Sequence, residues 1–263
     1  MADTEFTRGP ARRPAPVIDG PALQWATGLP TVNRQVYVGW LIETGILEDL
    51  DVALTSAGYN QVTIKHGGGN VVTHWAIETA NVFVLADGVQ SMGEMKRTDE
   101  RFGVAFGWRT LDTGRQQSVL KARVLLRELL AVGYTDPITL TVKSTLTGDV
   151  LAAFAQHCEV LDAVDAFRKL DNKPAMQPPF YACSLPLGPG AEVARGSGGQ
   201  TKEITPPVAD IPLPITREYI KAHWVKRDWL GCIEPLIDAT IAWSVAESQR
   251  IASDTPAPAY EPA

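Results

Sequence analysis

The chain of 263 residues has little of what marks a secreted, membrane-bound or disulfide-stabilised protein. Its three cysteines, Cys158, Cys183 and Cys232, are odd in number and widely spaced, which argues against a disulfide framework or a cysteine-rich metal site and suits a reducing cytoplasm. No apolar run approaches the roughly 18 residues of a membrane span, and the N-terminus has no apolar segment typical of a secretory signal. We therefore expect a cytoplasmic protein without a membrane partner.

Motifs that bind nucleotides or activate a nucleophile are missing as well. Neither GxxxxGKS/T nor GxGxxG occurs, which argues against an NTPase or a dinucleotide enzyme. His66 opens a His-Gly-Gly-Gly sequence, which supplies oxyanion-hole amides in some esterases, but the Gly-x-Ser-x-Gly motif that such enzymes need does not occur. A hairpin turn is the preferred interpretation of these glycines, although glycine amides can also approach a phosphate closely.

Metal-ligand spacing is absent too, since the four histidines form no pattern such as HExxH. Acidic residues between Glu43 and Asp51 would have to converge to hold metal ions, and a solvated helix face is preferred. We therefore predict a protein that is not an enzyme, with no catalytic residue, no metal and no cofactor; a metal-dependent nuclease is the third-ranked alternative. The histidines are His66, His74, His157 and His223.

The most distinctive feature that is present is a basic segment from Lys96 to Arg127, in a chain whose net charge is −6. Aromatic rings are interleaved with its basic residues. Lysine and arginine can follow the phosphates of a single-stranded nucleic acid while flat rings stack on its bases. A negative total does not exclude such a partner, because binding depends on where the positive charge lies. The predicted binding residues are Lys96, Arg97, Arg101, Phe106, Trp108, Arg109, Arg115 and Lys121.

The rings of this segment have a second interpretation. Positions 102, 104, 106 and 108 share one side of a strand, so Phe102, Phe106 and Trp108 form the pattern of a core face as much as that of a stacking surface. Both interpretations stay open from the sequence. Trp40 and Trp75 are further stacking candidates outside the segment.

Apolar periodicity and turn residues predict a mixed α and β protein. A Gly/Asn turn between two alternating runs, at 61–64 and 71–77, is typical of a hairpin. The segment 116–132 is expected to be a largely buried helix that ends at Gly133. A helix from Thr147 to about Leu170 and helical structure over 216–251, divided or kinked at Pro235, are also expected. Further strands are expected at 35–42, 81–85, 102–106 and 137–142.

These elements suggest one core domain with appended helices. Prolines are dense over 171–214, where we expect a peripheral hairpin with a glycine-rich tip, since proline is tolerated on edge strands. The predicted organisation is a flexible arm at 1–16, a core domain at 17–215 that includes the hairpin at 171–214, C-terminal helices at 216–252 that pack on the core, and a disordered tail at 253–263.

A family resemblance adds to this interpretation. The segment from Val119 to Val160, in which a leucine-rich helix precedes Pro-Ile-Thr-Leu-Thr-Val-Lys-Ser and a second helix, is similar to uncharacterised single-stranded-DNA-binding-like proteins of phages and mobile elements. The sequence from Tyr181 to Gly188 adds to the similarity. The resemblance implies an α+β, OB-like fold, which is a β-centred barrel or curved sheet with inserted helices, a peripheral hairpin and C-terminal helices. It also implies DNA wrapping and homo-oligomers. The tail carries only Asp254 and Glu261 as acidic residues, unlike the acidic partner-recruiting tails of bacterial single-strand binders.

The sequence therefore predicts binding of single-stranded DNA, without strong sequence preference, in a groove lined by 96–127. The alternative is a non-catalytic scaffold component of a phage or mobile-element complex, which would dock through 171–214 and the terminal helices.

Overall fold

The computed structural model describes residues 21–33, 35–66, 69–87, 103–111, 113–196 and 201–253. The expected N-terminal arm lies outside the described residues, as does the expected C-terminal tail apart from Ser253, which ends the last helix. Residues 96–102 and 112 of the basic segment, which include Lys96, Arg97, Arg101 and Phe102, also lie outside them.

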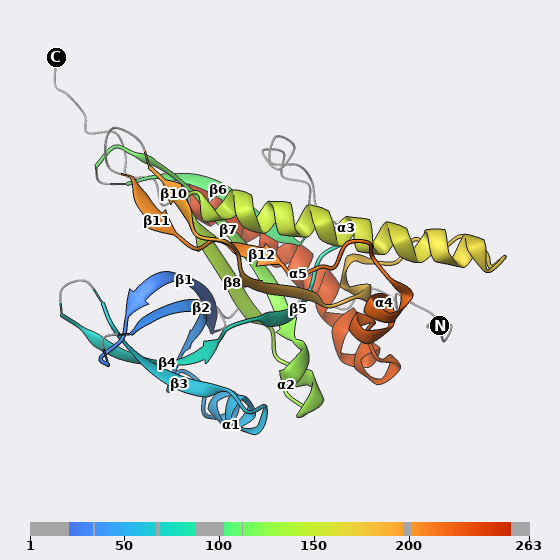
Figure 1. The fold of residues 1–263 in the computed structure, drawn as a ribbon, viewed down its shortest axis with the longest axis horizontal. Helices are drawn as coiled ribbons and strands as arrows, with labels where there is room; N and C mark the ends of the chain where they lie inside the picture. The colour runs from blue at the N-terminus through green and yellow to red at the C-terminus, as the bar shows by residue number, and fades with distance from the viewer. Residues whose placement is uncertain are drawn as a thin grey trace, which may run out of the picture.

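A ten-stranded, mixed sheet is the centre of the molecule (Figure 1). Its strands follow the order β12-β9-β5-β7-β8-β1-β2-β4-β3, and β6 pairs with β7 outside this path. The one parallel pair among the described strands joins β1 to β8, with Leu23 opposite Leu140. The strands of this sheet are β1 (Ala22–Pro30), β2 (Val36–Glu43), β3 (Asn60–Lys65), β4 (Val71–Ile77), β5 (Ala80–Val84), β6 (Val104–Thr110), β7 (Gln116–Leu126), β8 (Ile138–Lys143), β9 (Leu185–Pro189) and β12 (Pro207–Ala209).

The open sheet corrects the expected OB-like barrel. No described strand pairs β3 with β12, so the two ends of the sheet stay apart. The reason lies in β1, a strand that the sequence interpretation missed. Because β1 pairs with β2 on one side and with β8 on the other, it joins the β2-β4-β3 group to the strands that follow in the chain. One wide sheet results instead of a closed barrel.

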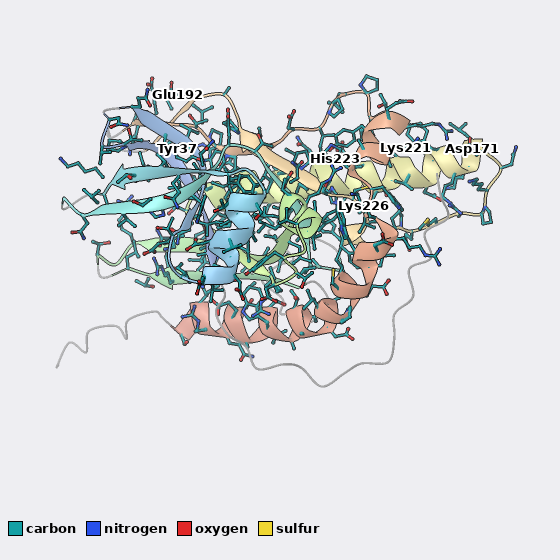
Figure 2. All side chains as sticks on the ribbon, turned by 90° about the horizontal axis from the view of Figure 1, so that it is seen from below. Tyr37, Asp171, Glu192, Lys221, His223 and Lys226 are labelled. Carbon is teal, nitrogen blue, oxygen red and sulfur yellow. The ribbon has the colours of Figure 1, made fainter. Side chains whose placement is uncertain are left out.

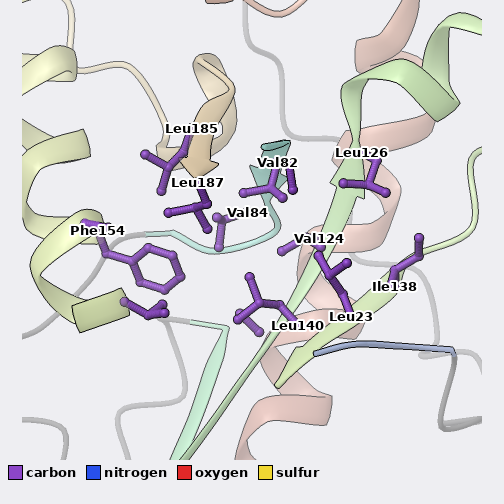
Figure 3. Close-up of a cluster of buried hydrophobic side chains, with 14 of the residues drawn as sticks. Leu23, Val82, Val84, Val124, Leu126, Ile138, Leu140, Phe154, Leu185 and Leu187 are labelled. Carbon is purple, nitrogen blue, oxygen red and sulfur yellow. The ribbon is translucent and has the colours of Figure 1, made fainter. Parts of the chain in front are cut away.

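Two long helices cover opposite faces of this sheet, α3 in front and α5 behind in the view of Figure 1. We call these the α3 face and the α5 face. On the α3 face, Phe154 packs among side chains of β5, β7, β8 and β9 (Figure 3). On the α5 face, one half of α5 packs on Phe83 and Leu125, and the other half packs on Ala105 and Val119. The helices are α1 (Glu48–Ser56), α2 (Arg127–Ala131), α3 (Leu146–Leu170), α4 (Arg217–His223) and α5 (Arg227–Ser253), with a short 3-10 turn η1 (Phe180–Ala182).

Strand β7 corrects the helix expected over 116–132, of which only α2 is helical. Leu120 and Val124 of β7 enter the core of the α3 face, whereas Val119 and Leu125 enter the clusters of the α5 face. Both faces of β7 therefore carry buried apolar side chains, although the α5 face also carries Lys121 and Arg123. Its sequence lacks the clean alternation of a half-buried strand, and apolar periodicity alone does not distinguish such a strand from a buried helix.

Other expectations hold more closely. The hairpin of β3 and β4 is confirmed, with His66 and Asn70 hydrogen-bonded next to the turn. Helix α3 ends at Leu170 as expected, but Thr147 is not its cap, because its hydroxyl donates to Ser144 O. The C-terminal helices separate at 224–226 and not at Pro235, which lies inside α5.

The proline-rich segment contributes more to the sheet than expected. A small hairpin does form from β10 (Val193–Arg195) and β11 (Lys202–Ile204). However, β9 and β12 join the main sheet, where β9 pairs with β5. None of the helices in the described part combines the length and the apolar content that a bilayer crossing requires.

Candidate nucleic-acid interface

The described part of the basic segment forms the antiparallel ribbon of β6 and β7. Successive side chains of a strand point to opposite faces of its sheet. Phe106 and Trp108 therefore lie on the α3 face, and Arg109 lies on the α5 face. The hydrogen bonds agree: Ser118, which is paired with Trp108, bonds to Thr147 of α3. The predicted rings and cations are thus divided between the two faces.

The two described rings differ in exposure. Phe106 is buried in the core cluster of the α3 face, so its ring is not open to a base in this structure. Trp108 is 42% exposed, and its ring meets that of Phe106 edge to face, with the centroids 6.2 Å apart. Trp108 is thus the described ring of the predicted set that a base can reach.

Arg109 is held against the sheet by its cross-strand neighbour. Its Nε and Nη2 atoms donate to Oε1 of Gln117, over 2.9 and 2.6 Å. Gln117 is in turn fixed by donating from Nε2 to Oγ of Ser144. These bonds use the guanidinium without neutralising its charge. Arg115 is exposed at the turn between β6 and β7, where its carbonyl accepts from Leu111 N.

Lys121 is partly neutralised by helix α5. Its Nζ lies 2.6 Å from Oε1 of Glu247, and Arg250 donates to both oxygens of the same carboxylate. Burial alone would raise the pKa of Glu247, but the hydrogen bonds from Arg250 and Lys121 hold that pKa below its ordinary value. One carboxylate thus serves two cations here.

Lys143 is a cation of this surface that the sequence interpretation missed, because it lies on β8, outside the segment 96–127. Its register partner is Val119, which contacts α5, so Lys143 belongs to the α5 face. Burial lowers the pKa of Lys143, and the nearby charges of Arg109 and Lys121 lower it further. No carboxylate of the described residues forms an ion pair with Lys143. We call Arg109, Lys121 and Lys143 the basic strip.

The basic strip continues into neutral polar residues on the same face of the sheet. Thr141 lies opposite Lys121 on β8, and the exposed Gln24 lies opposite Thr141 on β1. Beyond Lys121 on β7, Arg123 stacks on the ring of Trp243 at 4.9 Å and is covered by α5. The strip is therefore bounded by α5 on one side and by polar strand residues on the other.

A second basic group lies where α4 meets α5 (Figure 2). Lys221, Lys226 and Arg227 are exposed there. The ammonium of Lys226 lies 4.6 Å from the ring of Trp229, which occupies that face of the indole. Asp228 and Glu218 are close to these cations in sequence and reduce the local charge. This group is less concentrated than the basic strip.

A serine–histidine pair links Ser184, the residue before β9, to His223 of α4, but its geometry is structural. Ser184 Oγ lies 3.0 Å from Nδ1 of His223. Ser184 is only 1% exposed, and its backbone N–H donates to the carbonyl of His223. A substrate cannot reach this hydroxyl. The hydrogen bonds between Ser184 and His223 instead hold α4 against the sheet.

Comparison with known proteins gave no match, whether with family models, with curated proteins or with solved structures. The resemblance to single-stranded-DNA-binding-like proteins of phages and mobile elements therefore stays a prediction.

Proposed function

We propose that this protein binds single-stranded nucleic acid through the basic strip, and that it does so without strong sequence preference. The observation that carries the proposal is the convergence of Arg109, Lys121 and Lys143 on one face, close enough for the first two to lower the pKa of the third. These three cations repel one another because they lie close together. Among the described carboxylates, Glu247 alone forms an ion pair with any of them. A polyanion would relieve the repulsion.

Single-stranded nucleic acid is preferred over duplex because an accessible ring lies one residue from the strip along β6, on the opposite face of the sheet. Trp108 is the strand neighbour of Arg109 on β6, an edge strand that pairs with β7 alone among the described strands. A flexible single strand that crosses the edge of β6 can place phosphates against Arg109 and a base against Trp108. Stacking on such a ring tolerates any base, since every base has a π-face.

The proposal also covers where the protein acts and what it assembles with. The chain would act in the cytoplasm as a binding protein and not as an enzyme, in a phage or mobile-element context and with homo-oligomers allowed. A scaffold role through 171–214 and the terminal helices is the competing function. It predicts a defined oligomer that is indifferent to oligonucleotides.

The direct test is fluorescence anisotropy with a labelled oligothymidylate and with a duplex of the same length. We expect submicromolar binding to the single strand and much weaker binding to the duplex, at moderate salt. Micromolar or weaker binding that is equal for both ligands would end the proposal. A monodisperse oligomer in light scattering that stays unchanged by the oligonucleotide would favour the scaffold role instead.

A further inference from the structure

Helix α5 places one carboxylate against the basic strip. Trp243, Glu247 and Ile251 are spaced four residues apart, so they share one side of the helix. Trp243 and Ile251 are buried with Ala105 and Val119 of the sheet. Glu247 lies between them along the helix and is only 4% exposed. Apolar contacts on both sides of Glu247 therefore press its carboxylate towards the sheet.

Contacts with β6 hold the same part of α5 in place. Oγ of Ser248, the residue after Glu247, accepts from Phe106 N over 3.2 Å. Ile251 lies so close to Gly107 that a Cβ atom there would be 2.8 Å from Cγ2 of the isoleucine. The backbone at Glu247 is thus fixed beside the strip, and the carboxylate is a permanent part of this surface.

The three cations of the strip differ in what they face. Nζ of Lys121 lies 2.6 Å from Oε1 of Glu247, and the Lys121 side chain is only 18% exposed. Arg109 instead donates to the neutral amide of Gln117, and Lys143 is exposed. The salt dependence of single-strand affinity counts the phosphates that a protein's cations neutralise. A cation that a fixed carboxylate already neutralises adds little to that count.

We propose that Glu247 sets the affinity of the basic strip by keeping Lys121 out of phosphate binding, so that a single strand is bound through Arg109 and Lys143. The inference rests on the proposed function and adds the residue that limits it. It requires no movement of α5 or of the carboxylate, because the ion pair acts in the arrangement that the structure has. Removing the charge of Glu247 should therefore give the strip a third phosphate contact.

The test is anisotropy of labelled oligothymidylate with Glu247→Gln over a range of salt concentrations. We expect a slope of log K against log salt that is steeper by about 0.7, and binding that is about fivefold tighter at about 0.1 M salt, which is the factor that one more phosphate contact gives. Asp238→Asn is the matched control. Asp238 is exposed on α5 nine residues earlier, hence on the opposite side of the helix. Its replacement should leave the slope unchanged and alter the affinity by less than about twofold, since distant exposed charges are screened.

Two lysine variants test the same inference without changing α5. Lys143→Gln should reduce the slope by about 0.7, whereas Lys121→Gln should leave it nearly unchanged, although each removes one positive charge from the strip. Equal reductions in the two variants would overturn the inference. So would a folded Glu247→Gln variant that binds no more tightly than the wild type. In both cases the wild type still binds the single strand, so the proposed function stands; if neither the wild type nor Glu247→Gln binds it, the proposed function fails and the inference fails with it.

Discussion

Glu247 determines how much of the charge on the basic strip is available to a ligand. Its carboxylate accepts from both Lys121 and Arg250, and its side chain is buried between α5 and the sheet. An anionic ligand must therefore compete with Glu247 for Lys121, whereas Lys143 and Arg109 have no described carboxylate partner. The strip consequently has two available cations and one that is already engaged.

Trp108 is the residue at which the stacking interpretation and the core interpretation give opposite results. Because the ring is 42% exposed, Trp108→Ala should leave the protein folded. If a base stacks on the ring, the variant should lose about 1–3 kcal/mol of binding free energy for a single strand. Anisotropy and thermal unfolding, measured on the same preparation, test both statements. Unfolding of the variant, or unchanged affinity, would contradict the stacking role.

Buried His157 makes the stability of the protein depend on pH. Its Nε2 lies 2.9 Å from the carbonyl oxygen of Phe180. A carbonyl only accepts, so Nε2 carries the hydrogen of this bond. Burial lowers the pKa of His157 from 6.5 to about 4, although the hydrogen bond to Phe180 acts in the opposite direction.

Between about pH 4 and pH 6.5, the ring of His157 therefore binds a proton in the unfolded chain but not in the folded protein. Stability should be fully present above pH 6.5 and should fall by about 1.4 kcal/mol per pH unit from this group as the pH drops towards 4. Urea unfolding at a series of pH values checks this, with His157→Gln as the comparison, which should show a shallower pH dependence. An NMR titration in which the His157 ring protonates near pH 6.5 in the folded protein would contradict it.

At the scale of elements, the packing of α5 on β6 depends on a glycine. A Cβ atom added at Gly107 would lie 2.8 Å from Cγ2 and 3.2 Å from Cβ of Ile251. Phe106 N also donates to Oγ of Ser248, which ties the same part of α5 to β6. The end of α5 can therefore approach the sheet closely only because position 107 has no side chain.

Gly107→Ala should accordingly destabilise the protein by about 1–3 kcal/mol through overpacking. In an Ile251→Ala background the same change should cost much less, since the clashing atoms are gone. Gly231→Ala is the control: a Cβ there meets nothing within 4 Å, and the helix of α5 should become slightly more stable. Chemical denaturation of the four variants measures the coupling. If the losses of folding free energy in Gly107→Ala and Ile251→Ala simply add in the double variant, the contact between these two positions does not limit the packing of α5 on β6.

The elements also show where the sequence was informative. Alternating residues on either side of Gly69 and Asn70 predicted the β3–β4 hairpin, because its turn chemistry is local. The apolar residues of β7 led to the wrong prediction of a helix over 116–132. Such a strand differs from a buried helix only in what packs on it, here α3 on one face and α5 on the other. Strand β1 was missed because its pairing with β8 joins residues more than 100 positions apart.

At the scale of the whole molecule, the parallel pair of β1 and β8 decides what lies near the basic strip. That pair converts two groups of strands into one open sheet, and it brings Gln24 beside Thr141. The sequence indicated that positive charge would gather within 96–127. It could not indicate that Lys143 would join from another strand, because this follows from the pairing of β7 with β8. That Trp108 faces away from Arg109 follows from the alternation of side chains along β6.

The salt dependence of single-strand affinity tests the central claim most directly, because each phosphate contact that is lost reduces the slope of log K against log salt by about 0.7. We would measure anisotropy over a range of salt concentrations for the wild type, for Arg109→Gln/Lys143→Gln and for Lys169→Gln. Lys169 pairs with Asp165 in the last part of α3, and its replacement removes a positive charge away from the strip. We expect a slope that is smaller by about 1.4 in the double variant and unchanged in Lys169→Gln. Equal slopes for the wild type and the double variant would contradict it, because phosphates would then not be bound at this strip.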